Sequence, residues 1–130
     1  MPTVGGDTLF ASMYAAHNAL SEGLRQTFSG LRAVHSSRHV FGKHRIADDR
    51  IGNSESAQQD ALHPVIITHP DSGRKALYVN SNFTTHIEGC PEAESKALLD
   101  FLYHHAENPN FQCRFRWEAG SIAMWDNRAT

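Results

Sequence analysis

Residues 63–80 read HPVIITHPDSGRKALYVN, and this stretch decides the class of the fold. Two short runs within it, at 65–68 and 76–79, are rich in β-branched and aliphatic residues, which favour strands. The connection HPDSGR at 69–74 contains proline, aspartate, serine and glycine, which favour turns. The stretch therefore predicts an antiparallel β-hairpin.

A helix is predicted on the N-terminal side of this hairpin. Apolar residues there recur at spacings of four, four and three positions, which draws one apolar stripe along a helix. The residues of this stripe are Leu20, Leu24, Phe28 and Leu31. Ser21 suits the N-cap of this helix, and Ser29-Gly30 suits its end.

A longer helix and two strands are predicted on the C-terminal side. Residues 91–108 begin with a proline and carry two glutamates in the first turn, as helices often do. The apolar face of this helix consists of Leu98, Leu99, Leu102 and Ala106. Residues 112–117 and 121–125 are predicted strands joined at 118–120. The whole chain is predicted to form one mixed α/β (α+β) domain with antiparallel β character.

The segment at 42–61 is polar and shows little periodicity. Connections of this length without regular structure are typically lids, binding loops or disordered insertions. We therefore expect a flexible loop at about 42–61.

The composition excludes several classes of protein. The 130 residues, of which 40% are hydrophobic and 20% charged, suffice for one soluble globular domain. Twelve Lys+Arg against fourteen Asp+Glu residues give a formal net charge of −2, so we expect no nucleic-acid partner. Apolar runs are too short to cross a membrane. Two cysteines, Cys90 and Cys113, suit a reducing cytoplasm, and we expect the Cys113 thiol to be buried.

Nine histidines raise the question of a metal site. Non-haem iron is commonly held by two histidines and a carboxylate, and the pattern His-x-Asp or His-x-Glu places two such ligands on one side of a strand. Residues 69–71 and 86–88 match this pattern. On local grounds the simpler interpretation is that Asp71 caps a turn and that Glu88 is solvated.

The other histidines are open to more than one interpretation. His104-His105 falls in the last turn of the long helix, where an imidazole interacts well with exposed carbonyls. His35, His39 and His44 form either a real site or a polar surface.

A more specific pattern extends over most of the sequence. Its segments are GGDTLF at 5–10, GLRAVH at 30–35, HPVIITHP at 63–70, GRKALYVN at 73–80, FT at 83–84 and WDNRAT at 125–130. In this order they resemble the taurine dioxygenase family, whose members depend on Fe(II) and 2-oxoglutarate and fold as a double-stranded β-helix. The resemblance is weakest across the polar loop.

For residues 1–130 this resemblance implies a partial domain: a partial double-stranded β-helix, which is jelly-roll-like, with flanking helices. In the family the His-x-Asp ligand pair precedes GGDT, and the distal histidine follows the WDNR segment. We therefore expect the iron ligands outside these residues, with no catalytic or metal-binding residue among them. Asp126 and Asn127 would support the distal histidine.

The resemblance also assigns binding roles. Thr8 matches a threonine whose hydroxyl donates to the distal carboxylate of 2-oxoglutarate, although it also suits a helix N-cap. Phe83 matches an aromatic residue of the substrate pocket, although it also suits an ordinary core. Phe41 matches another aromatic residue of that pocket. Val40 replaces a serine of taurine dioxygenase itself, which argues against taurine as the substrate.

The resemblance implies an Fe(II)/2-oxoglutarate-dependent dioxygenase that oxidises a sulfonate, a sulfate ester or a related small organic acid. We expect the 130-residue chain to bind no iron and to be inactive alone. The parent enzyme could form a homo-oligomer. The alternative is a non-catalytic β-scaffold that binds a partner or a small acid.

Overall fold

The computed structural model describes residues 5–37 and 60–130. The strands are β1 (Thr8–Ala11), β2 (Arg32–His35), β3 (Ala61–Pro64), β4 (Ile66–Thr68), β5 (Lys75–Leu77), β6 (Thr84–Ile87) and β7 (Gln112–Phe115). The helices are α1 (Met13–Ala19), α2 (Glu22–Ser29), α4 (Glu92–Ala106) and the short 3-10 helix η3 (Pro109–Phe111). Most of the expected loop at 42–61 lies outside the described residues. Val40 and Phe41, just before the loop, also lie outside them.

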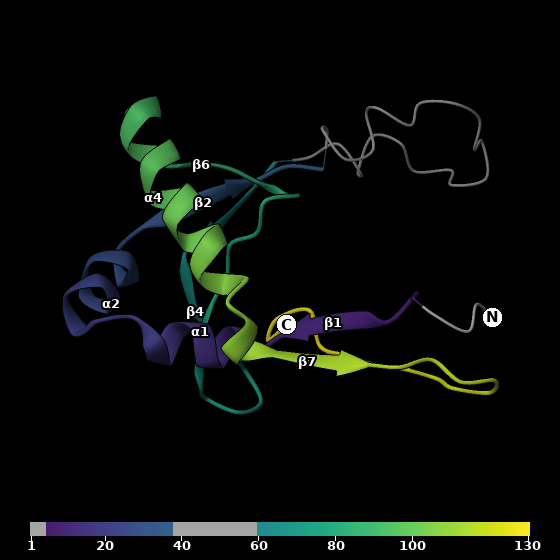
Figure 1. Cartoon of the computed structure of the whole chain (residues 1–130). Coiled ribbons are helices and arrows are strands. Elements are labelled where there is room, and N and C mark those ends of the chain that lie inside the picture. Colours follow the sequence, from purple (N-terminus) through teal and green to yellow (C-terminus); the bar gives the residue numbers. More distant parts are fainter. Residues whose placement is uncertain (1–4, 38–59) are drawn as a thin grey trace, which may run out of the picture.

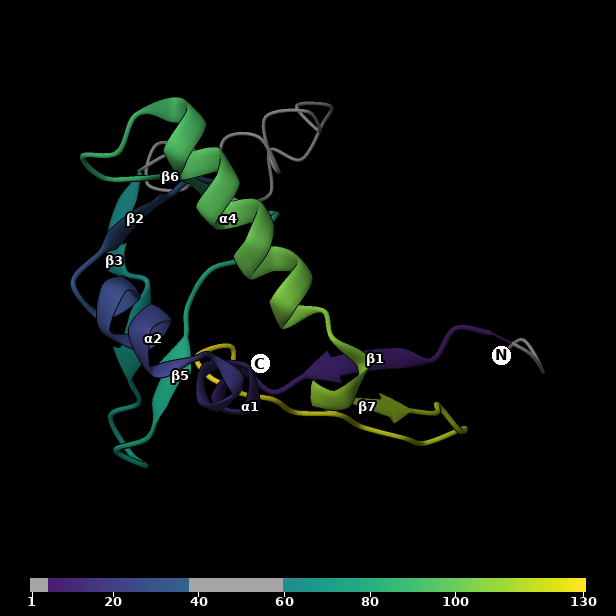
Figure 2. The same cartoon turned by 60° about the vertical axis from the view of Figure 1, so that its left-hand side comes forward.

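The described strands form three small antiparallel sheets. β1 pairs with β7, β2 lies between β3 and β6, and β4 pairs with β5. Figures 1 and 2 show α4 alongside the sheet that contains β6, and the β1–β7 ribbon extending away from the helices. The mixed α/β class with antiparallel sheets is therefore confirmed.

The predicted hairpin at 65–79 is confirmed as β4 and β5. Ile66 lies opposite Leu77, and Thr68 lies opposite Lys75. Gly73 has a φ of +68°, which an L side chain rarely adopts, and its amide donates to the carbonyl of His69. The turn residues thus have the conformation that their types indicate.

The predicted short helix is confirmed as α2, with Ser21 as N-cap and Gly30 as C-cap. The Ser21 hydroxyl accepts a hydrogen bond from the Leu24 amide at 3.3 Å. Before it, α1 begins after Ser12, whose hydroxyl accepts from the Ala15 amide. Ser12 therefore caps this helix, and Thr8, which lies in β1, does not.

The predicted long helix is confirmed as α4, which covers the β2–β6 sheet. Ser95 on this helix is buried, and its hydroxyl accepts a hydrogen bond from the Ile87 amide at 2.8 Å. The Tyr103 hydroxyl donates to the carbonyl of Thr84 at 3.1 Å. These two bonds attach α4 to both ends of β6.

The hydrophobic core lies between α2, α4 and the hairpin. Its largest fully buried side chains are Phe28, Val65, Leu77, Ile87 and Leu102. Phe28, Val65, Leu77 and Leu102 belong to predicted helices or strands, whereas Ile87 lies in β6, which the sequence did not predict. The apolar pattern of the sequence therefore identifies most of these core residues.

The predicted strand at 121–125 is wrong. Residues 116–130 contain no strand, and the side chains of Ile122 and Met124 are 85% and 92% exposed. The sheet of β1 and β7 has only these two strands, and residues 121–125, which follow the tight turn at Glu118–Ser121, form no ladder with either of them. Alternating apolar residues indicate strand propensity, but a strand also needs a partner.

The predicted burial of Cys113 is also wrong, because its side chain is exposed. Cys113 lies opposite Phe10 in the two-stranded ribbon. No second layer covers Cys113 on this two-stranded ribbon, so its side chain stays in solvent. None of the described helices combines the length and the apolar character needed to cross a bilayer.

A cluster of three rings lies on the β2–β3 strand pair. His35 stacks on Tyr78 with centroids 5.4 Å apart, and His63 packs edge-on against His35 at 5.1 Å. Burial, and secondarily the nearby His63, lower the pKa of His35 below its ordinary value of 6.5, although a hydrogen bond with the Tyr78 backbone opposes the shift. His35 therefore resists protonation in the folded protein.

The first prediction concerns the core. Leu102 is fully buried, so Leu102→Ala should lower the free energy of unfolding by about 2–5 kcal/mol, measured by urea denaturation. Its neighbour Phe101 is 45% exposed, so Phe101→Ala should cost less than about 1 kcal/mol. Equal losses for the two variants would contradict this core.

The second prediction concerns pH. Because the pKa of His35 is lowered by folding, the unfolded chain binds this proton more readily than the folded one. Stability should therefore be highest above about pH 6.5 and should decline as the pH falls below it. His35→Phe keeps a ring on Tyr78 and removes the titration, so its unfolding free energy should fall less between pH 7.5 and 5.5. An identical decline in both proteins would refute the assignment.

Candidate functional site

Thr8 lies at the start of β1, half-buried and opposite Phe115 of β7. Its Oγ1 accepts a hydrogen bond from the indole Nε1–H of Trp117 at 2.9 Å. The Trp117 ring is itself held edge-on against Phe115, with centroids 4.9 Å apart. The register of the β1–β7 ribbon therefore places Thr8 and Trp117 together.

This bond determines what the Thr8 hydroxyl can still do. A hydroxyl carries one donor and two acceptor positions, and the indole N–H can only donate. The Trp117 bond therefore uses an acceptor position of Thr8 and leaves its O–H proton available. The geometry fits the role that the family resemblance gives to Thr8, which is donation to a carboxylate oxygen.

Asp7, next to Thr8, holds the ribbon from its outer side. Its carboxylate forms ion pairs with Arg114 Nη1 at 3.2 Å and with Arg116 Nε at 3.9 Å. The two arginines are largely exposed, so we expect these pairs to contribute little to stability.

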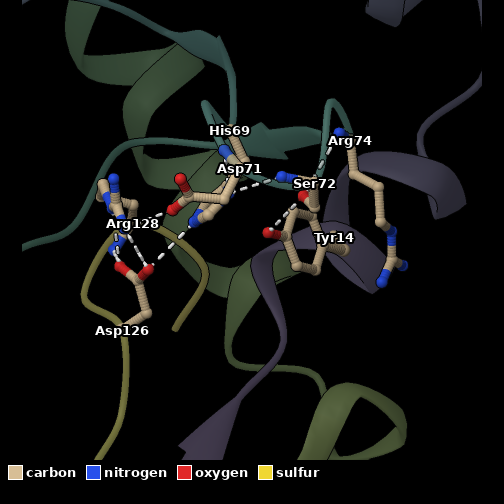
Figure 3. A network of polar contacts seen from close by, with 7 residues as sticks. All are labelled: Tyr14, His69, Asp71, Ser72, Arg74, Asp126 and Arg128. Carbon is tan, nitrogen blue, oxygen red and sulfur yellow. Dashed lines mark hydrogen bonds and ion pairs between the residues drawn. The ribbon is translucent and has the colours of Figure 1, made fainter.

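A second polar group is centred on His69, in the turn between β4 and β5 (Figure 3). His69 is 5% exposed. Its Nδ1 accepts hydrogen bonds from the backbone amides of Asp71 at 3.3 Å and Ser72 at 3.2 Å. Backbone amides can only donate, so Nδ1 carries the lone pair and the ring proton lies on Nε2.

The Nε2–H of His69 donates to Asp126 Oδ2 at 2.9 Å. The same carboxylate accepts from Arg128 through Nε at 2.9 Å and through Nη2 at 2.6 Å. Hydrogen bonds from the side chain and the backbone of Arg128, followed by the bond from His69, hold the pKa of Asp126 well below its usual range. Arg128 Nη2 also contacts Asp71 Oδ2 at 3.2 Å. The C-terminal segment is thus attached to the hairpin turn.

The prediction that Asp71 caps the turn is wrong, because the cap is the imidazole of His69. Asp71 has an exposed side chain that faces Arg128. A histidine lone pair can receive two turn amides at once here, while the carboxylate of Asp71 is drawn to the guanidinium.

The described residues contain one group of side chains with the spacing of metal ligands. It consists of His69, Asp71 and Asp126, each of which offers one ligand atom within 4.8 Å of the others. Their bonding does not fit Fe(II). Both ring nitrogens of His69 are used in hydrogen bonds, and Arg128 contacts both carboxylates. A cation would have to displace a guanidinium of the same sign, so this group is a structural clamp rather than a metal centre.

Three further side chains lie on one side of this clamp, as Figure 3 shows. The Tyr14 and Ser72 hydroxyls are hydrogen-bonded at 3.0 Å, and the Arg74 guanidinium lies 4.0 Å above the Tyr14 ring centroid. Tyr14 also packs edge-on against His69. α1, the hairpin turn and the C-terminal segment therefore meet at this point.

Phe83 lies half-buried just before β6, where its carbonyl accepts a hydrogen bond from the Ser36 amide at 2.8 Å. Both views show β6, which directly follows Phe83, apart from β1, which begins at Thr8 (Figures 1 and 2). The other two predicted pocket residues, Val40 and Phe41, lie outside the described residues.

The two histidines near the end of α4 both bond backbone carbonyls. Nδ1 of His104 bonds the carbonyl of Asp100 at 2.7 Å, as expected in the last turn of a helix. His105 instead reaches the Ala16 carbonyl of α1 at 2.7 Å. Glu88 is exposed and paired with Arg32, which agrees with a solvated carboxylate.

Sequence reasoning missed the donor role of Trp117 and the pairing of His69 with Asp126 and Arg128. The two halves of this clamp are 57 residues apart in the sequence, and no local periodicity relates them. The only signal was that both segments, HPVIITHP and WDNRAT, belong to the pattern that carries the family resemblance.

The third prediction tests the clamp. His69→Leu keeps an apolar side chain of similar size but removes the acceptor for two amides and the donor to Asp126. The free energy of unfolding should fall by about 1–3 kcal/mol, and the amides of Asp71 and Ser72 should exchange hydrogen faster. His86→Leu, which replaces an exposed imidazole, is the control. Unchanged exchange at both amides in His69→Leu would show that the clamp is absent in solution.

Comparison with known proteins adds to this geometry. The chain is 40% identical over 129 residues to an alpha-ketoglutarate-dependent 2,4-dichlorophenoxyacetate dioxygenase of Burkholderia sp., with 98% of this chain and 42% of that protein covered. It is 37% identical over 135 residues to an alpha-ketoglutarate-dependent sulfate ester dioxygenase of Pseudomonas putida, with 99% of this chain and 44% of that protein covered. The chain thus spans less than half the length of these relatives.

Solved structures agree with the sequence relatives. The crystal structure of a taurine dioxygenase from Burkholderia xenovorans superposes with a TM-score of 0.80 at 39% identity, covering 99% of this chain and 41% of that one. The family described as taurine catabolism dioxygenase TauD, TfdA family matches residues 1–130. The chain therefore belongs to the taurine dioxygenase (TauD/TfdA) family.

Proposed function

We propose that this chain is part of an Fe(II)/2-oxoglutarate-dependent dioxygenase that oxidises a sulfonate, a sulfate ester or a related small organic acid. The family match over residues 1–130 supports this proposal. The observation that carries it at the level of the site is the Thr8 hydroxyl, whose bond from Trp117 leaves its proton available. In this proposal β1, β7 and the residues around them form part of a double-stranded β-helix.

The part of Thr8 is to donate its hydroxyl proton to a carboxylate oxygen of 2-oxoglutarate. Trp117 keeps the oxygen of that hydroxyl in place and directs the free proton away from the indole. When bound, Fe(II) and 2-oxoglutarate supply the oxidising chemistry that hydroxylates a carbon of the substrate. The chain contributes the position of the cosubstrate rather than the reactive centre.

The clamp on His69 has a positioning part in this proposal. It holds Asp126 and Arg128 against the hairpin turn, and therefore fixes the position of this segment. Asn127 is held as well, because its Oδ1 accepts from the Trp125 indole N–H at 2.8 Å. Family resemblance places the distal iron ligand directly after this segment, so the clamp would set the position of that ligand.

The substrate side of the proposal rests on Phe83, Val40 and Phe41. Phe83 is half-buried, and its carbonyl accepts a hydrogen bond from the amide of Ser36. Ser36 precedes Val40 by four positions in the sequence. The three residues would form an apolar wall against the carbon skeleton of the substrate. Relatives whose names specify a chlorinated phenoxyacetate or a sulfate ester agree with a small organic anion as the substrate class.

The fourth prediction tests the cosubstrate site. Thr8→Val removes the hydroxyl at nearly constant volume and should weaken 2-oxoglutarate binding by about tenfold, as expected for one hydrogen bond to a carboxylate. Thr8→Ser keeps the donor and should bind within about twofold of the original chain. The measurement is a titration of each 15N-labelled protein with 2-oxoglutarate, followed at the amides of β1 and at the Trp117 indole.

Two outcomes would contradict the proposal. One is equal binding by Thr8→Val and Thr8→Ser, which would remove the hydroxyl from the site. The other is an absence of saturable shifts near Thr8 in the unsubstituted chain. A separate assay with Fe(II) and 2-oxoglutarate should give no succinate from the 130-residue chain, because its described residues hold no open iron site. Succinate formation would overturn that expectation.

A further inference from the structure

Large apolar side chains are exposed on the β1–β7 ribbon and on the segment that follows it. Ile122 and Met124 are almost fully exposed, and Trp125 and Leu9 are more than half exposed. These are four of the six large apolar side chains that are exposed in the described part of the chain, and the other two are less exposed. The exposed apolar surface is therefore concentrated on the ribbon, which extends away from the helices (Figure 1).

Residues 121–125 alternate between two sides, as an extended chain does. Ser121 and Ala123 are half-buried, whereas Ile122 and Met124 point into solvent. The backbone amides and carbonyls of the last four of these residues form no hydrogen bond with another described residue. The segment thus lacks both a partner for its backbone and a cover for its outward side chains.

The segment also lacks the features that protect an exposed extended edge. Residues 119–125 read AGSIAMW and contain no charged residue and no proline. Proteins place charges, prolines or bulges on an extended edge that stays in solvent, because an unprotected edge pairs with other chains. An exposed apolar patch likewise marks an interaction surface. The composition of this segment is therefore that of an edge that is covered.

The length of the family members indicates what covers it. The solved taurine dioxygenase from Burkholderia xenovorans is more than twice as long as the part of it that matches this chain. The rest of such a fold packs against the matched part, and burial of apolar surface is the main gain from that packing. An apolar face with an unpaired backbone is the surface on which this gain is largest.

We propose that residues 121–125 bind an extended segment of the parent enzyme from outside residues 1–130, through main-chain hydrogen bonds. The added segment would satisfy the unpaired amides, and its apolar side chains would cover Ile122 and Met124. This inference rests on the proposed function, in which the chain is part of a larger dioxygenase. Because Asp126 of the clamp follows directly, the added segment and the clamp would hold neighbouring residues.

The fifth prediction compares the 130-residue chain with the parent enzyme, cloned with the reading frame on both sides. In the 130-residue chain the amides of residues 122–125 should exchange hydrogen freely. In the parent enzyme every second one of these amides should exchange at least about a hundredfold more slowly, because one added strand pairs alternate residues. Hydrogen exchange measured by mass spectrometry on peptides covering these residues is the test. Equally fast exchange in both proteins, or a reading frame that encodes only residues 1–130, would overturn the proposal.

Matched variants at Met124 test the apolar cover. Met124→Lys should change the Tm of the 130-residue chain by less than about 2 °C, because the side chain is exposed there. It should lower the Tm of the parent enzyme by about 5 °C or more, because a charge would be buried. Met124→Leu keeps an apolar side chain and should leave both proteins within about 2 °C. Equal shifts of the two proteins by Met124→Lys would contradict the cover.

Two further measurements separate this proposal from its alternatives. If the parent enzyme is a dimer that Met124→Lys dissociates in sedimentation experiments, a second copy covers the face, and the proposal is wrong. Protected amides in a parent enzyme that forms no succinate would contradict the proposed function alone. Unprotected amides in a parent enzyme that forms succinate would contradict this inference alone.

Discussion

The bond between His69 and Asp126 is the contact on which the arrangement of the polar residues depends. The imidazole is buried, accepts two turn amides on one nitrogen and donates to the carboxylate from the other. Both ring nitrogens of His69 are therefore used, Nδ1 as an acceptor and Nε2 as a donor. Because Asp126 also binds Arg128, and Arg128 contacts Asp71, the C-terminal segment returns to the same turn. Met13 reinforces this by donating its amide to the carbonyl of Ala129 at 3.0 Å. A hairpin turn, the first helix and the last residues are thereby held in one relative position.

The contact between Thr8 and Trp117 depends on strand register in the same way. Thr8 lies on β1 and Trp117 follows the end of β7, so a slip of one residue between the two strands would turn the Thr8 side chain to the other face. Ring contacts limit such a slip, because Trp117 packs on Phe115 and Phe10 packs on Trp125. The direction of the Thr8 hydroxyl proton thus depends on aromatic packing along the ribbon.

Local patterns in the sequence predicted the parts of the fold that local physics determines. The apolar spacing of α2 and α4, the Ser21 cap and the turn residues between β4 and β5 are all confirmed. Prediction failed where a residue's state depends on a distant partner. Residues 121–125 have the composition of a strand but pair with neither β1 nor β7. His69 rather than Asp71 caps its turn, because the nearby Arg128 attracts the carboxylate. For the site, resemblance indicated Thr8, whereas the Trp117 donor and the His69 clamp required coordinates.

The placement of the two tryptophans has a practical consequence for spectroscopy. Trp117 and Trp125 are the only tryptophans of the sequence, and both lie in the segment after β7. Each packs against a phenylalanine of the β1–β7 ribbon. Intrinsic fluorescence therefore reports on that part of the molecule and not on α2, α4 or the hairpin. Far-ultraviolet circular dichroism, in contrast, is dominated by the helices. Unfolding curves recorded by the two methods would coincide only if the ribbon and the helical core unfold as one cooperative unit.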